Sequence, residues 1–103
     1  MSTTIQTFFE SQLVNEVKPY TTDFTDFIRS GASISAVAAS YAQTFNPGGS
    51  ALASGSCAAG ISAGSVTHIS PALSAAGSYS FLVTATMTDN DVRKAIWYVQ
   101  IDA

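Results

Sequence analysis

Residues 77–103 read GSYSFLVTATMT, then DND, then VRKAIWYVQIDA. Two runs rich in β-branched and aromatic residues flank a short polar turn, and this pattern is typical of a β-hairpin. Large or apolar residues alternate with polar ones, so one face of the hairpin is predicted to be buried and the other wetter. The residues predicted to face the core are Tyr79, Phe81, Val83, Ala85 and Met87 in the first run and Ala95, Trp97, Val99 and Ile101 in the second.

Shorter strand-like runs precede the hairpin. One starts after the boundary at Lys18-Pro19, an alanine-rich run spans residues 34–41, and a third spans residues 65–69. The Ala/Ser/Gly-rich residues 50–64 predict a loose strand or a long loop, because they offer few apolar anchors. Six to seven short antiparallel strands with turn residues between them predict an all-β, immunoglobulin-like β-sandwich over residues 17–103. Tyr79, near the start of the penultimate strand, suits the tyrosine-corner position of such folds.

The first sixteen residues have two interpretations. Their apolar side chains fall near helical spacing, yet the same residues suit an extended arm with apolar plugs. We predict an N-terminal arm over residues 1–16, either a short helix or extended. Adjacent phenylalanines need cover from the chain's own core or from a partner. The predicted partner-binding residues are Ile5, Phe8, Phe9, Leu13 and Val14.

Composition restricts the classes of function. A length of 103 residues suits one domain. Only 11% of the residues are charged, so little keeps this domain apart from its neighbours, and we expect it to be oligomeric. A formal net charge of −3 with four basic residues argues against nucleic acid as a partner. The N-terminus lacks a basic region and a long apolar run, so we expect no signal peptide and no membrane partner.

Candidate chemistry is sparse. His68 is the only histidine and Cys57 the only cysteine, so we expect both to be structural and no internal disulfide to form. Asp23 and Asp26 have an odd spacing that sends them to opposite faces of a strand, and Asp23 is expected to accept hydrogen bonds from nearby backbone. We therefore predict no catalytic residue and no enzyme activity.

Two binding alternatives remain at this level. Residues 89–91, Asp-Asn-Asp, offer oxygens to calcium but lack the rest of an EF-hand spacing, so a turn without metal is expected. The aromatic residues include Phe24, Tyr41 and Trp97, which are expected in the core rather than in an exposed carbohydrate-binding platform. No cofactor and no metal site is predicted.

Three stretches resemble a known family. Residues 17–28, VKPYTTDFTDFI, followed by GASI at 31–34, resemble the opening of small tailed-bacteriophage proteins of the fibre-tail adaptor type. The AGSY of residues 76–79 and the AIWYV of residues 95–99 resemble the closing strand and final hairpin of that family. The resemblance covers roughly residues 17–103. It departs in residues 1–16, in the Ala/Ser-rich middle, and where Phe24 and Phe27 stand in place of the usual tryptophans.

This resemblance implies an immunoglobulin-like sandwich that acts, without catalysis, as a virion structural protein made in the host cytoplasm. It implies an adaptor in the tail or neck region that holds neighbouring tail or fibre proteins, with other virion proteins and copies of itself as partners. One alternative is a capsid decoration, or cement, protein of the phage head. The other is an unrelated carbohydrate- or adhesin-type binding module.

Overall fold

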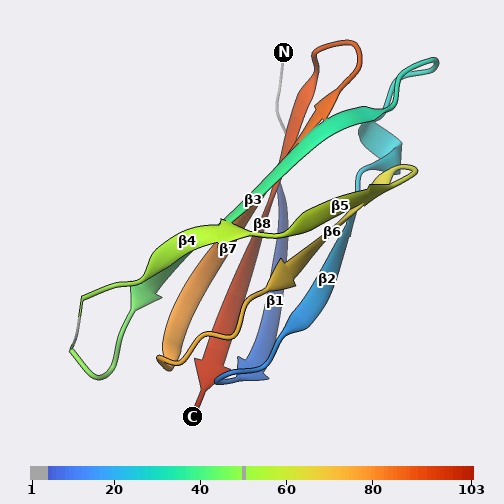
Figure 1. Cartoon of the computed structure of the whole chain (residues 1–103). Coiled ribbons are helices and arrows are strands. Elements are labelled where there is room, and N and C mark those ends of the chain that lie inside the picture. Colours follow the sequence, from blue (N-terminus) through green and yellow to red (C-terminus); the bar gives the residue numbers. More distant parts are fainter. Residues whose placement is uncertain (1–4, 50) are drawn as a thin grey trace.

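Eight strands form two sheets that face each other in this computed structural model, which describes residues 5–49 and 51–103 (Figure 1). One sheet has five strands in the order β1-β8-β7-β3-β4, and the other has three in the order β2-β6-β5. The prediction of an all-β protein with two sheets is confirmed. The strands are β1 Gln6–Leu13, β2 Lys18–Asp23, β3 Ile34–Phe45, β4 Ser54–Cys57, β5 Ala59–Ser62, β6 Ser65–Ser70, β7 Gly77–Met87 and β8 Val92–Asp102, and a 3-10 turn, Thr25–Phe27, follows β2.

The predicted hairpin is strands β7 and β8. They pair antiparallel, with Phe81 opposite Trp97 and Tyr79 opposite Val99. Every hairpin residue predicted to face the core is buried, as the alternation of large and polar residues requires. In the connecting turn Asn90 has a φ of 69°, a conformation that asparagine tolerates better than most residues.

Within the predicted N-terminal arm, residues 6–13 take the extended alternative, and residues 1–4 lie outside the described residues. Strand β1 lies parallel beside β8, with Gln6 opposite Ala95 and Leu13 opposite Asp102. The helical alternative is therefore wrong for residues 6–13. The expectation of six to seven antiparallel strands also needs correction, because there are eight strands and the β1–β8 pair is parallel. The parallel direction is possible because β1 and β8 are joined through nearly the whole chain rather than through a hairpin.

The Ala/Ser/Gly-rich middle forms two short strands instead of one loose strand or a loop. Strand β4 pairs with β3 in the larger sheet, whereas β5 pairs with β6 in the smaller one. The chain changes sheets at Ala58, whose carbonyl accepts a hydrogen bond from Ile69 N at 2.9 Å. Small residues suit this crossing, since a Cβ added to Gly55 would lie 2.9 Å from the Tyr41 ring.

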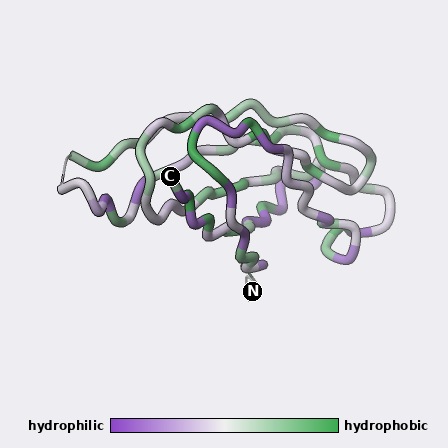
Figure 2. Tube along the Cα trace, turned by 90° about the horizontal axis from the view of Figure 1, so that it is seen from below, coloured by the Kyte–Doolittle hydropathy of each residue, from purple (hydrophilic) through white to green (hydrophobic). Residues whose placement is uncertain are grey.

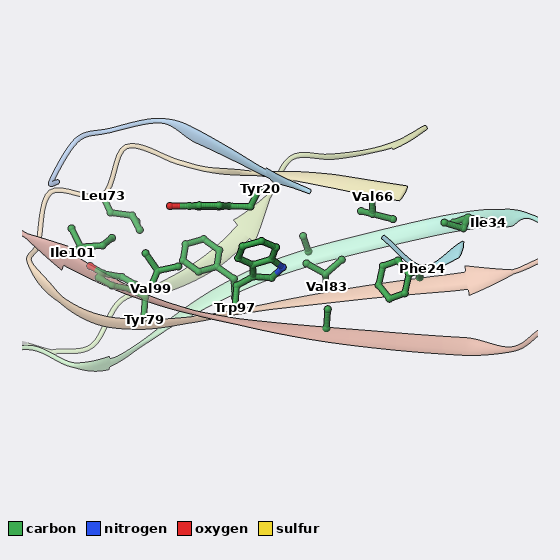
Figure 3. Packing of buried hydrophobic residues seen from close by; sticks show 14 of the residues in the cluster. Tyr20, Phe24, Ile34, Val66, Leu73, Tyr79, Val83, Trp97, Val99 and Ile101 are labelled. Carbon is green, nitrogen blue, oxygen red and sulfur yellow. The ribbon is translucent and has the colours of Figure 1, made fainter. Parts of the chain in front are cut away.

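The core lies between the two sheets (Figure 3). Trp97 is buried there, as predicted, and its indole Nε1 donates a hydrogen bond to Thr22 Oγ1 at 2.9 Å. Tyr20 from the smaller sheet lies against the same indole, with ring centroids 5.1 Å apart. Hydropathy changes from residue to residue along the strands, so each sheet has a core face and an outer face (Figure 2).

Candidate functional site: the outer face of the five-stranded sheet

The five predicted partner-binding residues divide into two groups. Phe8 stacks on Trp97 with ring centroids 4.3 Å apart, and Val14 packs against the same core. The side chains of Ile5, Phe9 and Leu13 instead lie exposed, at 46%, 76% and 55%. Successive residues of a strand point to opposite faces, so Phe8 turns inward and Phe9 outward. The structure therefore brings Phe8 and Val14 into the chain's own core and leaves the other three on its surface.

Further apolar side chains share the outer face of the five-stranded sheet. Phe9 stacks on Tyr98 of the neighbouring strand, with ring centroids 5.5 Å apart and an interplanar angle of 23°. Residues 36, 38, 40 and 42 of β3, which lie on this face, are alanine or serine. The exposed large apolar residues of this face are Phe9, Leu13, Phe45, Leu82, Val92 and Tyr98. We call this set, together with the alanines and serines between them, the outer face.

The outer face carries very little charge. Strand alternation places Lys94 and Asp102 on it, near opposite ends of β8. The rest of it is built from Ala, Ser, Thr, Gln100, Ile96 and the apolar residues named above. The centre of a protein–protein interface is typically rich in aromatic residues and poor in charged ones. The outer face has that composition.

An open hollow crosses the outer face from β1 to β3. Its volume is about 430 Å³. Aromatic and polar side chains both line it, and the Ser78 hydroxyl hydrogen-bonds Gln100 Oε1 at 2.9 Å. The lining residues are Phe9, Glu10, Thr44, Ser78, Tyr79, Tyr98, Val99 and Gln100.

His68 lies in the core rather than at a surface site. Its ring is fully buried and lies 5.6 Å from the rings of Tyr20, Phe81 and Trp97. In the part of the chain that the structure describes, neither ring nitrogen has a hydrogen-bond partner. Burial lowers the pKa of His68 to about 4, so the ring is neutral at pH 7.

Cys57 is half-buried at the edge of the core. Burial raises the pKa of its thiol to about 11, which keeps it protonated and weakly nucleophilic at neutral pH. Because both nitrogens of His68 lack partners among the described residues, that ring does not activate the thiol through a hydrogen bond. A Cys–His nucleophile is therefore not assembled in this structure.

The carboxylates make local hydrogen bonds. Asp23 Oδ1 accepts a hydrogen bond from Thr25 N at 2.8 Å, as expected, and hydrogen bonds from the side chain and backbone of Thr25 lower the pKa of Asp23. In the β7–β8 turn, Asp89 Oδ1 accepts from Asp91 N at 3.1 Å, and Asp91 Oδ2 lies 3.0 Å from Arg93 Nε. Over residues 5–49 and 51–103, no three His, Cys, Asp or Glu side chains lie together as a metal-binding group.

Sequence reasoning missed two features that the structure brings out. It assigned Tyr98 and Leu82 to the wetter side of the hairpin without seeing that they join Phe9 on one surface. The sequence signal for this surface was the presence of large apolar residues, Leu82 and Tyr98, on the predicted solvent face of the hairpin. It also missed Gln12, which is buried, accepts a hydrogen bond from the Tyr20 hydroxyl at 2.7 Å and donates one to Ser70 Oγ at 3.1 Å.

Comparison with known proteins adds no relative. No family model matches the chain, and no curated protein matches it. Among the described residues, no helix is long and apolar enough to cross a membrane.

Proposed function

We propose that this chain is a non-enzymatic structural protein of a tailed bacteriophage virion, an adaptor in the tail or neck region that holds neighbouring tail or fibre proteins. The observation that carries the assembly role is the outer face. It exposes Phe9, Leu13, Phe45, Leu82 and Tyr98 and has few charges. Contiguous exposed apolar patches on soluble proteins mark interaction sites.

The virion assignment rests on the resemblance of residues 17–28, 76–79 and 95–99 to fibre-tail adaptors. We propose an immunoglobulin-like arrangement of the sandwich on the same grounds. The Tyr79 hydroxyl supports it, because it donates to the carbonyl of Ala75 at 2.7 Å, which is the bond that a tyrosine corner makes.

Capsid decoration is the second candidate, because a charge-poor sheet face also suits attachment to a capsid surface. A carbohydrate-binding module has less support. Phe9 and Tyr98 stack on each other, so one face of each ring is covered by its neighbour and is closed to a stacking sugar.

The proposal is tested by charging the outer face. Leu82→Lys places a cation on the exposed apolar surface, and Ile69→Lys is a matched control on the opposite sheet, because the two side chains are similarly exposed at 37% and 39%. We expect the Leu82 variant to fold but to be lost from purified phage particles, while the Ile69 variant is incorporated like the wild type. Labelled antibody on the particles distinguishes tail or neck from head.

Two results would contradict the proposal. If the wild-type protein is missing from purified particles, the proposed virion role is wrong. If the Leu82 and Ile69 variants are incorporated equally, the outer face is not the contact surface. Specific binding of the wild type on a glycan array, lost with Tyr98→Ala, would support the binding-module alternative instead.

A further inference from the structure

Strand β1 leaves one backbone edge of the five-stranded sheet open. Val14 N donates a hydrogen bond to Asp102 O at 2.8 Å, so the backbone of this residue points toward β8. Backbone groups alternate in direction along a strand, so the even-numbered residues of β1 face β8 and the odd-numbered ones face away. The outward residues are Thr7, Phe9, Ser11 and Leu13.

The C-terminal end of this edge is closed by the chain itself. Leu13 N donates to Glu16 Oε1, and Glu16 N donates to Leu13 O at 3.3 Å. No such bond covers the outward backbone of Thr7, Phe9 or Ser11 within the described ranges. Within β1, the free hydrogen-bonding groups are therefore those of Thr7, Phe9 and Ser11, a short run that is symmetric about Phe9.

The other edge strands carry the usual protection against pairing. Strand β2 begins with Lys18 and Pro19, and proline and lysine both discourage a further strand. Strands β4 and β5 have only four residues each. Strand β1 has eight residues, no proline and no lysine, and Glu10 is its single charge. Among these edges, β1 alone offers a long, unprotected template.

We propose that β1 pairs antiparallel with β1 of a second copy of this chain, around a two-fold axis at Phe9. In this register Phe9 lies opposite Phe9 and Thr7 opposite Ser11, and each opposed pair exchanges two hydrogen bonds. The free groups of Thr7, Phe9 and Ser11 in both copies are then satisfied. Isologous pairing of this kind closes a dimer, since each copy uses the same surface.

The register that is shifted toward the C-terminal end of β1 is worse. Placing Phe9 opposite Ser11 sets Glu10 against Glu10 and brings Thr7 against Leu13, whose backbone is already bonded to Glu16. Like charges directly opposite each other in a sheet are destabilising. The symmetric register instead places Glu10 opposite Phe8. A second copy in the symmetric register thus pairs the free groups of β1 without setting its only charge against itself.

Pairing would also join the two outer faces. Phe9 of each copy would meet across the axis, with Tyr98 stacked behind it, and Leu13 would lie beside Ile5. The dimer deepens the proposed assembly role by naming a second copy as one partner, but its geometry does not depend on a place in the virion.

The first test removes one hydrogen-bond donor from the open edge. Wild-type protein, at 10.7 kDa per chain, is expected to sediment as a dimer. Ser11→Pro deletes an N–H that faces away from β8, so β1 stays in its sheet while dimer dissociation rises about a hundredfold. Ser11→Thr keeps the N–H and is expected to behave like the wild type. A monomeric wild type, or a proline variant that dimerises as tightly, overturns the proposal.

The second test does not depend on the proline variant folding. With Cys57→Ala as background, Phe9→Cys places two thiols across the two-fold axis, at the roughly 5.5 Å Cα separation of a hydrogen-bonded pair, which a disulfide spans. We expect oxidation to cross-link Phe9→Cys and not Leu13→Cys. Faster cross-linking at Leu13 would overturn the register. A monomer that still enters particles would overturn the dimer alone, whereas a dimer absent from particles would overturn only the virion role.

Discussion

At the scale of single residues, His68 is the least usual group in this protein. Its imidazole is fully buried among aromatic rings and has no hydrogen-bond partner in the described part of the chain. A buried polar group without a partner weakens the folded state. Burial also disfavours the charged ring, which lowers the pKa of His68 from its ordinary value of 6.5 to about 4.

This pKa predicts acid destabilisation. The unfolded chain binds a proton near pH 6.5 and the folded chain only near pH 4, so stability from this group is complete above pH 6.5 and falls as pH drops toward 4. Between pH 7.5 and 4.5 the loss should be about 2–3 kcal/mol. Urea unfolding at both pH values measures it. His68→Phe should remove most of this difference, and parallel pH profiles for the two proteins would contradict the prediction.

Trp97 should be the most sensitive core position. It stacks on Phe8, lies against Tyr20 and donates a hydrogen bond to Thr22. Trp97→Ala is expected to reduce the free energy of unfolding by about 3–5 kcal/mol, as other large core truncations do. Tyr98→Ala, one residue along on the exposed side, should reduce it by less than about 1 kcal/mol. Tryptophan emission typical of a water-exposed indole in the wild type would also be inconsistent with this core.

At the scale of elements, β1 is both a structural strand and a candidate contact surface. Its inward residues contact the core, while its outward residues face solvent. Substitutions of the adjacent residues Phe8 and Phe9 test whether the inward and outward sides of β1 differ in this way. Phe8→Ala should reduce stability by about 2 kcal/mol, because the ring stacked on Trp97 is half-buried, whereas Phe9→Ala should change it by less than about 1 kcal/mol. Denaturant unfolding of both variants at low protein concentration measures this, and equal losses would show that β1 does not lie as described.

Strands β4 and β5 should open more readily than the hairpin. They have four residues each, and their side chains are mostly exposed. Local stability follows buried contacts, so backbone amides of residues 51–64 should exchange faster than those of β7 and β8 in native-state hydrogen exchange. Equal protection of both regions in a monomeric sample, such as Ser11→Pro, would refute this.

At the scale of the whole molecule, the two sheets are unequal. The three-stranded sheet covers one face of the five-stranded sheet, and the other face of the larger sheet stays uncovered (Figure 1). The described chain is elongated, with extents of 48 × 25 × 19 Å. The bare, charge-poor sheet face and the open sheet edge are the two features on which the proposals of an assembly role and of a dimer rest.

Self-association through the open edge predicts a melting temperature that depends on protein concentration. Dimerisation stabilises the folded state by mass action, so melting should shift upward as the concentration is raised. Ser11→Pro should melt at the same temperature across that range. A wild-type melting temperature that does not change with concentration would argue against a dimer.

The hairpin faces were predictable from the sequence. Alternation along residues 77–103 shows which side of each strand is buried, because neighbouring side chains of a strand point to opposite faces whatever lies across from them. The burial of Trp97 and Tyr79, the polar turn at residues 89–91 and the sheet-forming character of the whole chain follow from the same local rule. The low charge favoured an assembled protein, and this stays a prediction.

The tertiary structure alone decided where β1 lies and what its residues do. Helical and extended readings of residues 1–16 had equal local support, and the choice depends on contacts remote in the chain, such as Phe8 with Trp97 and Gln12 with Tyr20 and Ser70. The change of sheets at Ala58 has the same origin. Local pattern determines which way a side chain points, whereas strand neighbours are selected by long-range packing and hydrogen bonds, and these selected an open edge centred on Phe9.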